Sequence, residues 1–176
     1  MSLIIRPCEP DDARALALVS QATILETYAH VIPRADLLDF VETEHGVARY
    51  TDWLGRPDHR LWLAEVPGTG APGGYCLLCP PNLPVAEEAG DIELRRIYLL
   101  RRFQGGGQGA ALLRTAIAAA TEAGAARLLL SVYSDNPGAR TFYARQGFAQ
   151  VGTHRFRVGP VDYDDLVLAK RLDQAG

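Results

Sequence analysis

Residues 91–110 have the sequence DIELRRIYLLRRFQGGGQGA, and this stretch decides the fold. Its first ten residues end in an apolar run that predicts a strand, and the alanine-rich sequence that follows, to about Ala123, predicts a helix. Between them lie Gly105, Gly106, Gly107 and Gly109, which let the backbone approach a ligand closely. Because a helix N-terminus carries partial positive charge, this connection predicts a binding site for an anion such as phosphate.

The residues around these glycines narrow the choice of ligand. Arg101, Arg102 and Arg114 make the mouth of the loop basic although the net charge is -3, which favours a phosphate site over a flexible turn. The P-loop of an NTPase is disfavoured, because its lysine and hydroxyl residue are missing. Residues 105–110 match the looser dinucleotide fingerprint, but they follow the fourth predicted strand and no acidic residue lies about 20 positions on. A nucleotide-binding protein therefore stays as an alternative.

The rest of the chain predicts short strands and helices around this unit. Further strands are expected at 3–6, 60–66, 75–79, 127–133, 148–152 and 164–170, and further helices from Pro10 to about Tyr28, at 34–53 and from Ser134 to Gly147. This order predicts a single domain, residues 1–176, of the α/β or α+β class. We expect one central mixed sheet with helices on both faces.

Composition excludes several classes of protein. Apolar residues make up 48% of the 176 residues and charged residues 22%, as in globular rather than disordered chains. No apolar run is long enough to span a membrane, and Arg6 and Glu9 interrupt the stretch that a signal peptide would need. We therefore expect a cytoplasmic protein with no membrane and no nucleic-acid partner. Cys76 and Cys79 form only half of a zinc motif, so we expect no metal.

Two motifs in the chain resemble those of a known family. Gln104, Gly107 and Gly109 follow a strand in the pattern Q-x-x-G-x-[G/A]. A second block has the pattern N-x-x-A-x-x-F-Y-x-x-x-G-F, formed by Asn136, Ala139, Phe142, Tyr143, Gly147 and Phe148. Both resemble the GNAT family of N-acetyltransferases, most closely over residues 91–152. The resemblance implies a mostly antiparallel sheet of six to seven strands that is splayed between strands 4 and 5.

The resemblance also implies acetyl-CoA as the acetyl donor. N–H groups of the glycine-rich loop would hold its pyrophosphate, the edge of the fourth strand would pair with its pantetheine amides, and Tyr143 would donate a proton to the departing thiolate. The expected cofactor-binding residues are Ile97, Tyr98, Leu99, Arg102, Gln104, Gly105, Gly106, Gly107, Gln108, Gly109, Ala110, Asn136, Ala139 and Tyr143. For Tyr143 the alternative is an aromatic residue of the core, and for Asn136 a helix N-cap.

Attack of an amine on a thioester needs a group that takes the proton of the amine, and Glu93 is the predicted catalytic base. Alternation along its strand would place it on one face with Arg95, Ile97 and Leu99. The alternative is a carboxylate that is paired with Arg95 or Arg96.

The acceptor is a small-molecule amine in this interpretation. Residues 92–98, the glycine-rich loop, and 152–156 with 164–168 resemble the PaiA-type branch of the family, which implies a polyamine. Acidic residues that would suit a polycation, or would otherwise form a solvated face, are Asp36, Asp39, Glu42, Glu44, Asp91 and Glu93. An amine of an amino acid, peptide or antibiotic is the first alternative. A non-catalytic module that binds or senses acyl-CoA is the second.

Further side chains are candidates without a fixed place. His154, expected just after the sixth strand, is a second possible base or a structural histidine. Other candidates for the wall of an acceptor pocket are Tyr28, His30, Trp53 and Trp62. No cysteine is placed to carry an acyl group, so we expect direct transfer. The resemblance suggests a homodimer formed through the last strands.

Overall fold

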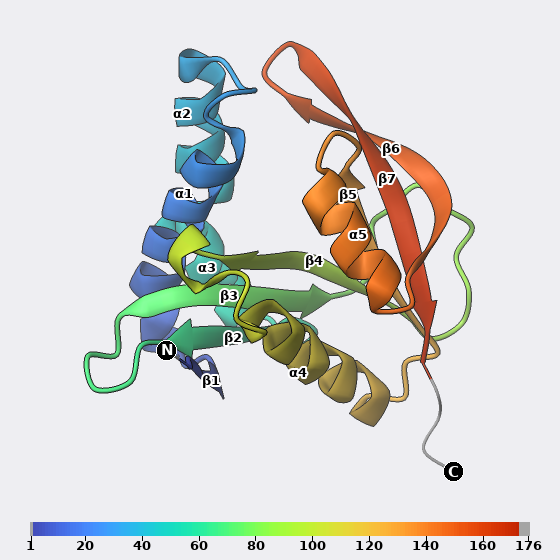
Figure 1. The fold of residues 1–176 in the computed structure, drawn as a ribbon, viewed down its shortest axis with the longest axis horizontal. Coiled ribbons are helices and arrows are strands. Elements are labelled where there is room, and N and C mark those ends of the chain that lie inside the picture. Colours follow the sequence, from blue (N-terminus) through green and yellow to red (C-terminus); the bar gives the residue numbers. More distant parts are fainter. Residues whose placement is uncertain (1, 173–176) are drawn as a thin grey trace.

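The computed structural model describes residues 2–172 (Figure 1). The strands are β1 (Ile4–Pro7), β2 (Arg60–Glu65), β3 (Pro72–Cys79), β4 (Asp91–Leu99), β5 (Arg127–Tyr133), β6 (Ala149–Val158) and β7 (Val161–Arg171). The helices are α1 (Ala13–Tyr28), α2 (Arg34–Glu44), α3 (Val47–Leu54), α4 (Gln108–Glu122) and α5 (Pro137–Arg145), with 3-10 turns at Pro10–Asp12 and Arg101–Phe103.

The strands form one seven-stranded sheet in the order β1-β2-β3-β4-β5-β7-β6. All neighbours are antiparallel except β4 and β5, which are parallel and pair only over Asp91–Glu93 and Arg127–Leu129. Beyond this short ladder the two strands separate, and in Figure 1 β2 to β4 run across the molecule while β5 to β7 rise steeply away from them. The predicted fold class and the predicted split between strands 4 and 5 are therefore confirmed.

Different helices cover the two faces of the sheet. On one face, Leu16 of α1 and Tyr50 of α3 pack against Tyr75 of β3 in a buried cluster. On the other face, Leu112 of α4 and Tyr143 of α5 belong to a larger cluster that includes most buried side chains of β5. Burying apolar surface on both sides makes the sheet the centre of the molecule.

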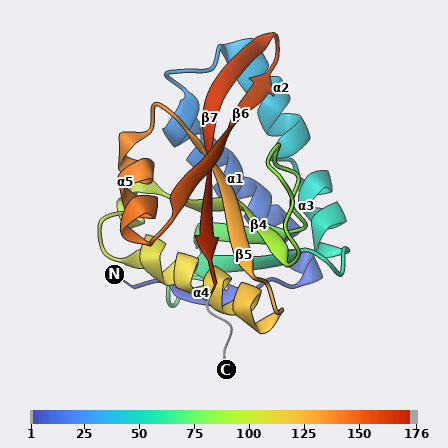
Figure 2. The same cartoon turned by 90° about the vertical axis from the view of Figure 1, so that its right-hand side faces the viewer.

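A third cluster joins α2 to the hairpin of β6 and β7, which lies beyond β5 in the sheet. Ile32 and Leu37 pack there with Val158 at the end of β6. The rings of Phe40 and Phe156 meet edge to face at 5.6 Å. Figure 2 shows α2 beside the upper part of this hairpin. This contact between α2 and the hairpin joins the two parts of the molecule that the split between β4 and β5 separates.

Two predicted elements need correction. The helix expected at 34–53 is two helices, because the chain breaks at His45 and Gly46; a Cβ atom at residue 46 would collide with the carbonyl oxygen of Glu42. The last two strands are longer than predicted, so that residues 149–158 and 161–171 form a long hairpin. His154 consequently lies within β6 and not after it, opposite Asp165 of β7.

A β-bulge in β4 also overturns the predicted placement of Glu93. Leu77 of β3 pairs with Arg96 and Leu78 pairs with Leu94, so Arg95 is an extra residue. Leu94 and Ile97, three positions apart, thus share the face covered by α4. Glu93 lies on the opposite face, because the bulge shifts the alternation by one residue.

Candidate active site

A cavity of about 1020 Å³ opens between β4 and β5 on the side of α4 and α5. The predicted cofactor residues that line it are Ile97, Tyr98, Leu99, Gln104, Gly105, Gly107, Gly109, Ala110, Asn136, Ala139 and Tyr143. Arg102, Gly106 and Gln108 do not line it, and the side chain of Gln108 accepts a hydrogen bond from Leu3 N at 3.0 Å instead. The cavity therefore joins the two motifs that the sequence singled out, although 27 positions separate Gly109 from Asn136.

The glycine-rich loop has the backbone geometry of an anion site. Gly105 and Gly107 have φ angles of 80° and 81°, in the left-handed region that glycine adopts without strain. Gly107 is the N-cap of α4, so the first N–H groups of this helix face the loop. The side chain of Gln104 donates to Leu99 O at 2.9 Å and ties the loop to the end of β4. No side chain fills the space above these glycines, where a Cβ atom would meet nothing within 4 Å. The loop thus has room and donors for a pyrophosphate.

Tyr143 lies on α5 in the wall of this cavity, packed between the rings of Phe142 and Phe148. Burial raises the pKa of its phenol, so the hydroxyl stays protonated at neutral pH. Tyr143 is therefore both a core aromatic and a protonated group at the cavity. Asn136 accepts a hydrogen bond from Ala139 N at 3.0 Å, which makes it the N-cap of α5, the alternative predicted for it.

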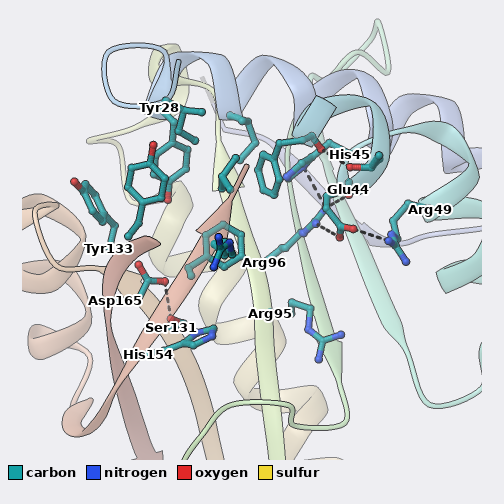
Figure 3. Close-up of a pocket in the computed structure, with 18 of the residues that line it drawn as sticks. Tyr28, Glu44, His45, Arg49, Arg95, Arg96, Ser131, Tyr133, His154 and Asp165 are labelled. Carbon is teal, nitrogen blue, oxygen red and sulfur yellow. Dashed lines mark hydrogen bonds and ion pairs between the residues drawn. The ribbon is translucent and has the colours of Figure 1, made fainter. Parts of the chain in front are cut away.

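A second cavity of about 690 Å³ lies on the other face of the sheet, between α2 and the hairpin of β6 and β7. Both cavities share five lining residues at the split: Tyr28, Arg95, Tyr98, Ser131 and Tyr133. In Figure 3, Tyr28, Tyr133, Ser131 and Asp165 gather at one end of this second cavity, while Glu44, His45 and Arg49 lie at the other. The two cavities therefore meet where β4 and β5 part.

A buried polar network forms the wall of the second cavity near α2 and α3. Arg96 donates to the Tyr50 hydroxyl and to Glu44 O, both at 2.8 Å, and lies 4.6 Å from the centre of the Trp53 ring. It also contacts Nδ1 of His45 at 3.2 Å. Because arginine only donates, Nδ1 accepts and the ring proton lies on Nε2. Burial, and then the charge of Arg96, lower the pKa of His45 to about 2.

Glu93 lines the second cavity but both of its oxygens are engaged. Arg95 donates to Oε1 at 3.0 Å and to Oε2 at 3.1 Å, and the backbone N–H of Asn82 donates to Oε2 at 2.7 Å. The alternative predicted for this carboxylate, a pair with Arg95, is thus present in the structure. Asn82 is a contact that the sequence did not suggest, because it comes from the loop before β4.

The acidic residues predicted to receive a polycation are only partly brought together. Asp36, Asp39, Glu44 and Glu93 line the second cavity, whereas Glu42 and Asp91 do not. Asp91 instead accepts two hydrogen bonds from Arg127, at 2.7 and 2.6 Å, and holds the end of β4 against β5.

Two residues that sequence reasoning did not assign to the site lie at the meeting point of the cavities. Ser131 of β5 donates to Asp165 of β7 at 2.7 Å. The only sequence signal for Asp165 is its place directly before the apolar stretch 166–169, where an acidic side chain is unusual. Its approach to Ser131 depends on pairing between β5 and β7, which a single sequence does not show.

Neither membrane helices nor metal clusters contribute to this site. Within residues 2–172, no helix is long and apolar enough to cross a membrane. The same residues contain no group of three or more His, Cys, Asp or Glu side chains that is arranged to hold a metal ion.

Comparisons with known proteins agree with this geometry. Residues 26–148 match the model of the acetyltransferase (GNAT) family. An uncharacterised N-acetyltransferase of Mycobacterium tuberculosis is 31% identical over 161 residues, which cover 92% of this chain and 98% of that protein.

Two solved structures share the fold. The PaiA N-acetyltransferase of Thermoplasma acidophilum, in complex with coenzyme A, superposes with a TM-score of 0.75 at 19% identity, covering 97% of this chain and 99% of that one. The ribosomal-protein-S18-alanine N-acetyltransferase of Escherichia coli has a TM-score of 0.67 at 19% identity, covering 99% and 96%. The chain therefore belongs to the GNAT family and is an acetyl-CoA-dependent N-acetyltransferase.

Proposed function

We propose that the protein transfers the acetyl group of acetyl-CoA directly to a primary amine of a small acceptor, with a polyamine as the preferred class. The observation that carries this proposal is the junction of the two cavities at the split between β4 and β5. An acetyl donor in the first cavity and an amine in the second would approach each other from opposite faces of the sheet. Such positioning replaces a slow encounter in solution by a reaction within one complex.

The first cavity would bind acetyl-CoA through the glycine-rich loop, the edge of β4 and Tyr143. N–H groups of Gly105, Gly107 and Gly109 would bind the pyrophosphate. The edge of β4 beyond Glu93, which β5 leaves unpaired, would bind the pantetheine amides. Arg102, Gly106 and Gln108 remain outside the cavity wall, so we assign them at most a peripheral part. Tyr143 would protonate the departing thiolate, a role that its protonated phenol supports.

Direct transfer is supported by the state of the cysteines. Cys76 and Cys79 are buried in β3 and line neither cavity. Burial raises the pKa of the Cys79 thiol to about 12, which leaves little thiolate to carry an acetyl group. We therefore propose a ternary complex without an acyl-enzyme.

The polyamine class is supported by the outer part of the second cavity. Glu44 and Glu93 are neutralised by Arg49 and Arg95. Asp36 and Asp39 of α2 also line this cavity, and their charges would attract a cationic tail that extends from the split.

A competing acceptor class is an amino acid or peptide. Arg157 lines the same cavity, its side chain is 67% exposed, and its ion pair with Asp162 is long, at 3.8 Å. Such an arginine would suit the carboxylate of an acceptor. One enzyme of the same fold acts on the alanine of a ribosomal protein, which makes peptides a reasonable part of any test.

The role of Glu93 as base stays a prediction. Because Arg95 and Asn82 occupy its oxygens, it would have to act through a water molecule or a rearranged ion pair. A homodimer also stays a prediction: β6 is an outer strand of the sheet and exposes Val151, and light scattering of the purified protein tests whether copies associate there.

The test of the proposed function is release of thiol from acetyl-CoA by the purified protein. The acceptors are spermidine, spermine, L-lysine, an alanine-initiated peptide and an aminoglycoside, each beside a reaction without amine. We expect release that depends on amine and is fastest with spermidine or spermine. Faster release with the peptide or with L-lysine would replace the polyamine by the second class. Amine-independent release alone would contradict the proposal.

A further inference from the structure

Asp165 differs from Glu93 and Glu44 of the second cavity because, like Asp36 and Asp39, it forms no ion pair within the described chain, although His154 lies opposite it on β6. Glu93 is paired with Arg95, and Glu44 with Arg49. None of the ion pairs among residues 2–172 includes Asp165. Its negative charge therefore remains available to a cation that enters the cavity.

Asp165 lines the second cavity and is held beside the junction of the two cavities by Ser131, which lines both. It lies on β7 directly opposite Tyr133 of β5, and its Oδ2 accepts the hydrogen bond of Ser131 at 2.7 Å. Ser131 lines both cavities and lies two residues beyond Leu129, where pairing between β4 and β5 ends. Oδ1 has no hydrogen bond to any other described residue. One oxygen thus orients the carboxylate and the other stays free.

Tyr28, Tyr98 and Tyr133 line the same cavity as this carboxylate. The rings of Tyr28 and Tyr133 meet edge to face with their centres 6.3 Å apart, and Tyr133 lies opposite Asp165 where β5 pairs with β7. Burial, and to a smaller degree the charge of Asp165, raise the pKa of Tyr28 to about 12. Figure 3 shows Tyr28, Tyr133 and Asp165 at the same end of the cavity. Aromatic rings beside a carboxylate are the surroundings that favour an ammonium group.

We propose that Asp165, in the cavity lined by Tyr28, Tyr98 and Tyr133, binds the ammonium group of the acceptor and takes its first proton in place of Glu93. The inference rests on the proposed function and adds the binding site of the reacting amine to it. The amine nitrogen gives one proton to Oδ1 and then bonds to the acetyl carbon. As the C–S bond breaks, the sulfur takes a proton from the hydroxyl of Tyr143. The nitrogen then gives its second proton to the oxygen of Tyr143, which restores the hydroxyl. Asp165 passes its proton to solvent, so the products are the acetamide, CoA and one proton.

The charged and titratable groups around Asp165 define the expected pH dependence. They are Tyr28 on α1, Arg95 and Tyr98 on β4, Tyr133 on β5, His154 on β6 and the adjacent Asp164. Burial raises the pKa of Asp165, against the opposing effects of Ser131 and His154. A higher pKa makes a carboxylate a stronger base near neutral pH. The value of kcat/KM should therefore rise with pH through a pKa above the usual range of aspartate and then level off.

The experiment compares Asp165→Asn with Asp164→Asn, a matched control whose side chain is 81% exposed on the same strand. We expect Asp165→Asn to lower kcat/KM for the best amine roughly 100-fold at pH 7, with unchanged affinity for CoA. The loss should shrink by about tenfold per pH unit toward pH 9, because the amine then needs less help to lose its proton. Asp164→Asn should behave as the wild type. A loss of the same size at every pH, or equal losses in both variants, would overturn the proposal.

Binding to the CoA complex separates this inference from the proposed function. Calorimetric titration of CoA-saturated protein with each amine of the panel should give an affinity at least tenfold weaker in Asp165→Asn than in Asp164→Asn. If the wild type binds an amine but transfers no acetyl group, the proposed function is refuted. The weaker amine binding of Asp165→Asn would in that case still support the ammonium site. Equal binding by both variants, or no binding of any amine by the wild type, would refute the site. The melting temperature of each variant confirms that it is folded.

Discussion

The proposed role of the Tyr143 hydroxyl as general acid can be tested by a single substitution. Because burial raises the pKa of this phenol, it holds its proton over the whole range in which the enzyme works. Tyr143→Phe removes the proton and keeps the ring between Phe142 and Phe148. We expect kcat to fall about 100-fold, as for loss of a general acid.

The affinity for CoA and the melting temperature are the controls for this variant. Both should stay near their wild-type values, because the apolar contacts of the ring are retained. An unchanged kcat would show that the hydroxyl is only part of the core.

His45 gives a prediction about stability at the same scale. The pKa of its buried ring is lowered to about 2, so the folded protein keeps it neutral, whereas the unfolded chain protonates it below about pH 6.5. The unfolded state then binds more protons, and the free energy of unfolding falls as the pH falls. Between pH 6.5 and 5.5 the loss should be about 1 kcal/mol.

The measurement is urea unfolding of the wild type, His45→Asn and His30→Asn over this pH range. The slope with pH should be smaller in His45→Asn. Replacement of His30, which is exposed, should leave the slope of the wild type. A slope that persists in His45→Asn would assign the acid sensitivity to other groups.

At the scale of elements, the loop before α4 depends on two glycines in the left-handed region. Gly107→Ala would force a side chain into φ near 81°, at about 1 kcal/mol, and would weaken CoA binding because the N–H groups at the helix start would turn away. Gly106→Ala is the matched control, since Gly106 has no positive φ and a Cβ atom there would meet nothing within 4 Å.

Chemical unfolding and CoA titration of the two variants test this loop. The stability and the affinity should both fall in Gly107→Ala and stay within error in Gly106→Ala. If both variants bind CoA equally well, the conformation of this loop does not govern binding.

The elements differ in how far a single sequence predicts them. The loop at Gly105 to Gly109 and the N-cap at Asn136 are local, since neighbouring residues determine them. The sequence predicted a glycine-rich connection before a helix, and it offered the N-cap as the alternative role of Asn136. The bulge at Arg95 depends on how β3 pairs with β4, and strict alternation therefore placed Glu93 on the wrong face. Asp165 reaches Ser131 only through pairing of β5 with β7. A single sequence therefore did not predict the contacts that depend on pairing between distant strands.

At the scale of the molecule, one sheet ties the whole described chain together. Its strands extend from Ile4 to Arg171, and the apolar clusters on its two faces share strands β2 to β4. Neither half of the described chain keeps a complete core without the other, because one apolar cluster joins β2, β3 and β4 to α4, β5 and β7. That residues 1–176 form a single domain stays a prediction.

A single domain of this kind should unfold in one cooperative transition, with a calorimetric enthalpy equal to the van 't Hoff enthalpy. Acetyl-CoA binds only the folded form, so at a free concentration of 100 times its Kd it should add about 2.7 kcal/mol and raise the whole transition by roughly 5–10 °C. NAD and ATP should cause no comparable shift, because the loop lacks the lysine and hydroxyl residue of a P-loop and no acidic residue follows its dinucleotide-like glycines about 20 positions on. Differential scanning calorimetry with each ligand tests these points together. Two separate transitions, of which acetyl-CoA moves only one, would mean that the part holding the glycine-rich loop folds independently of the part that holds the acceptor.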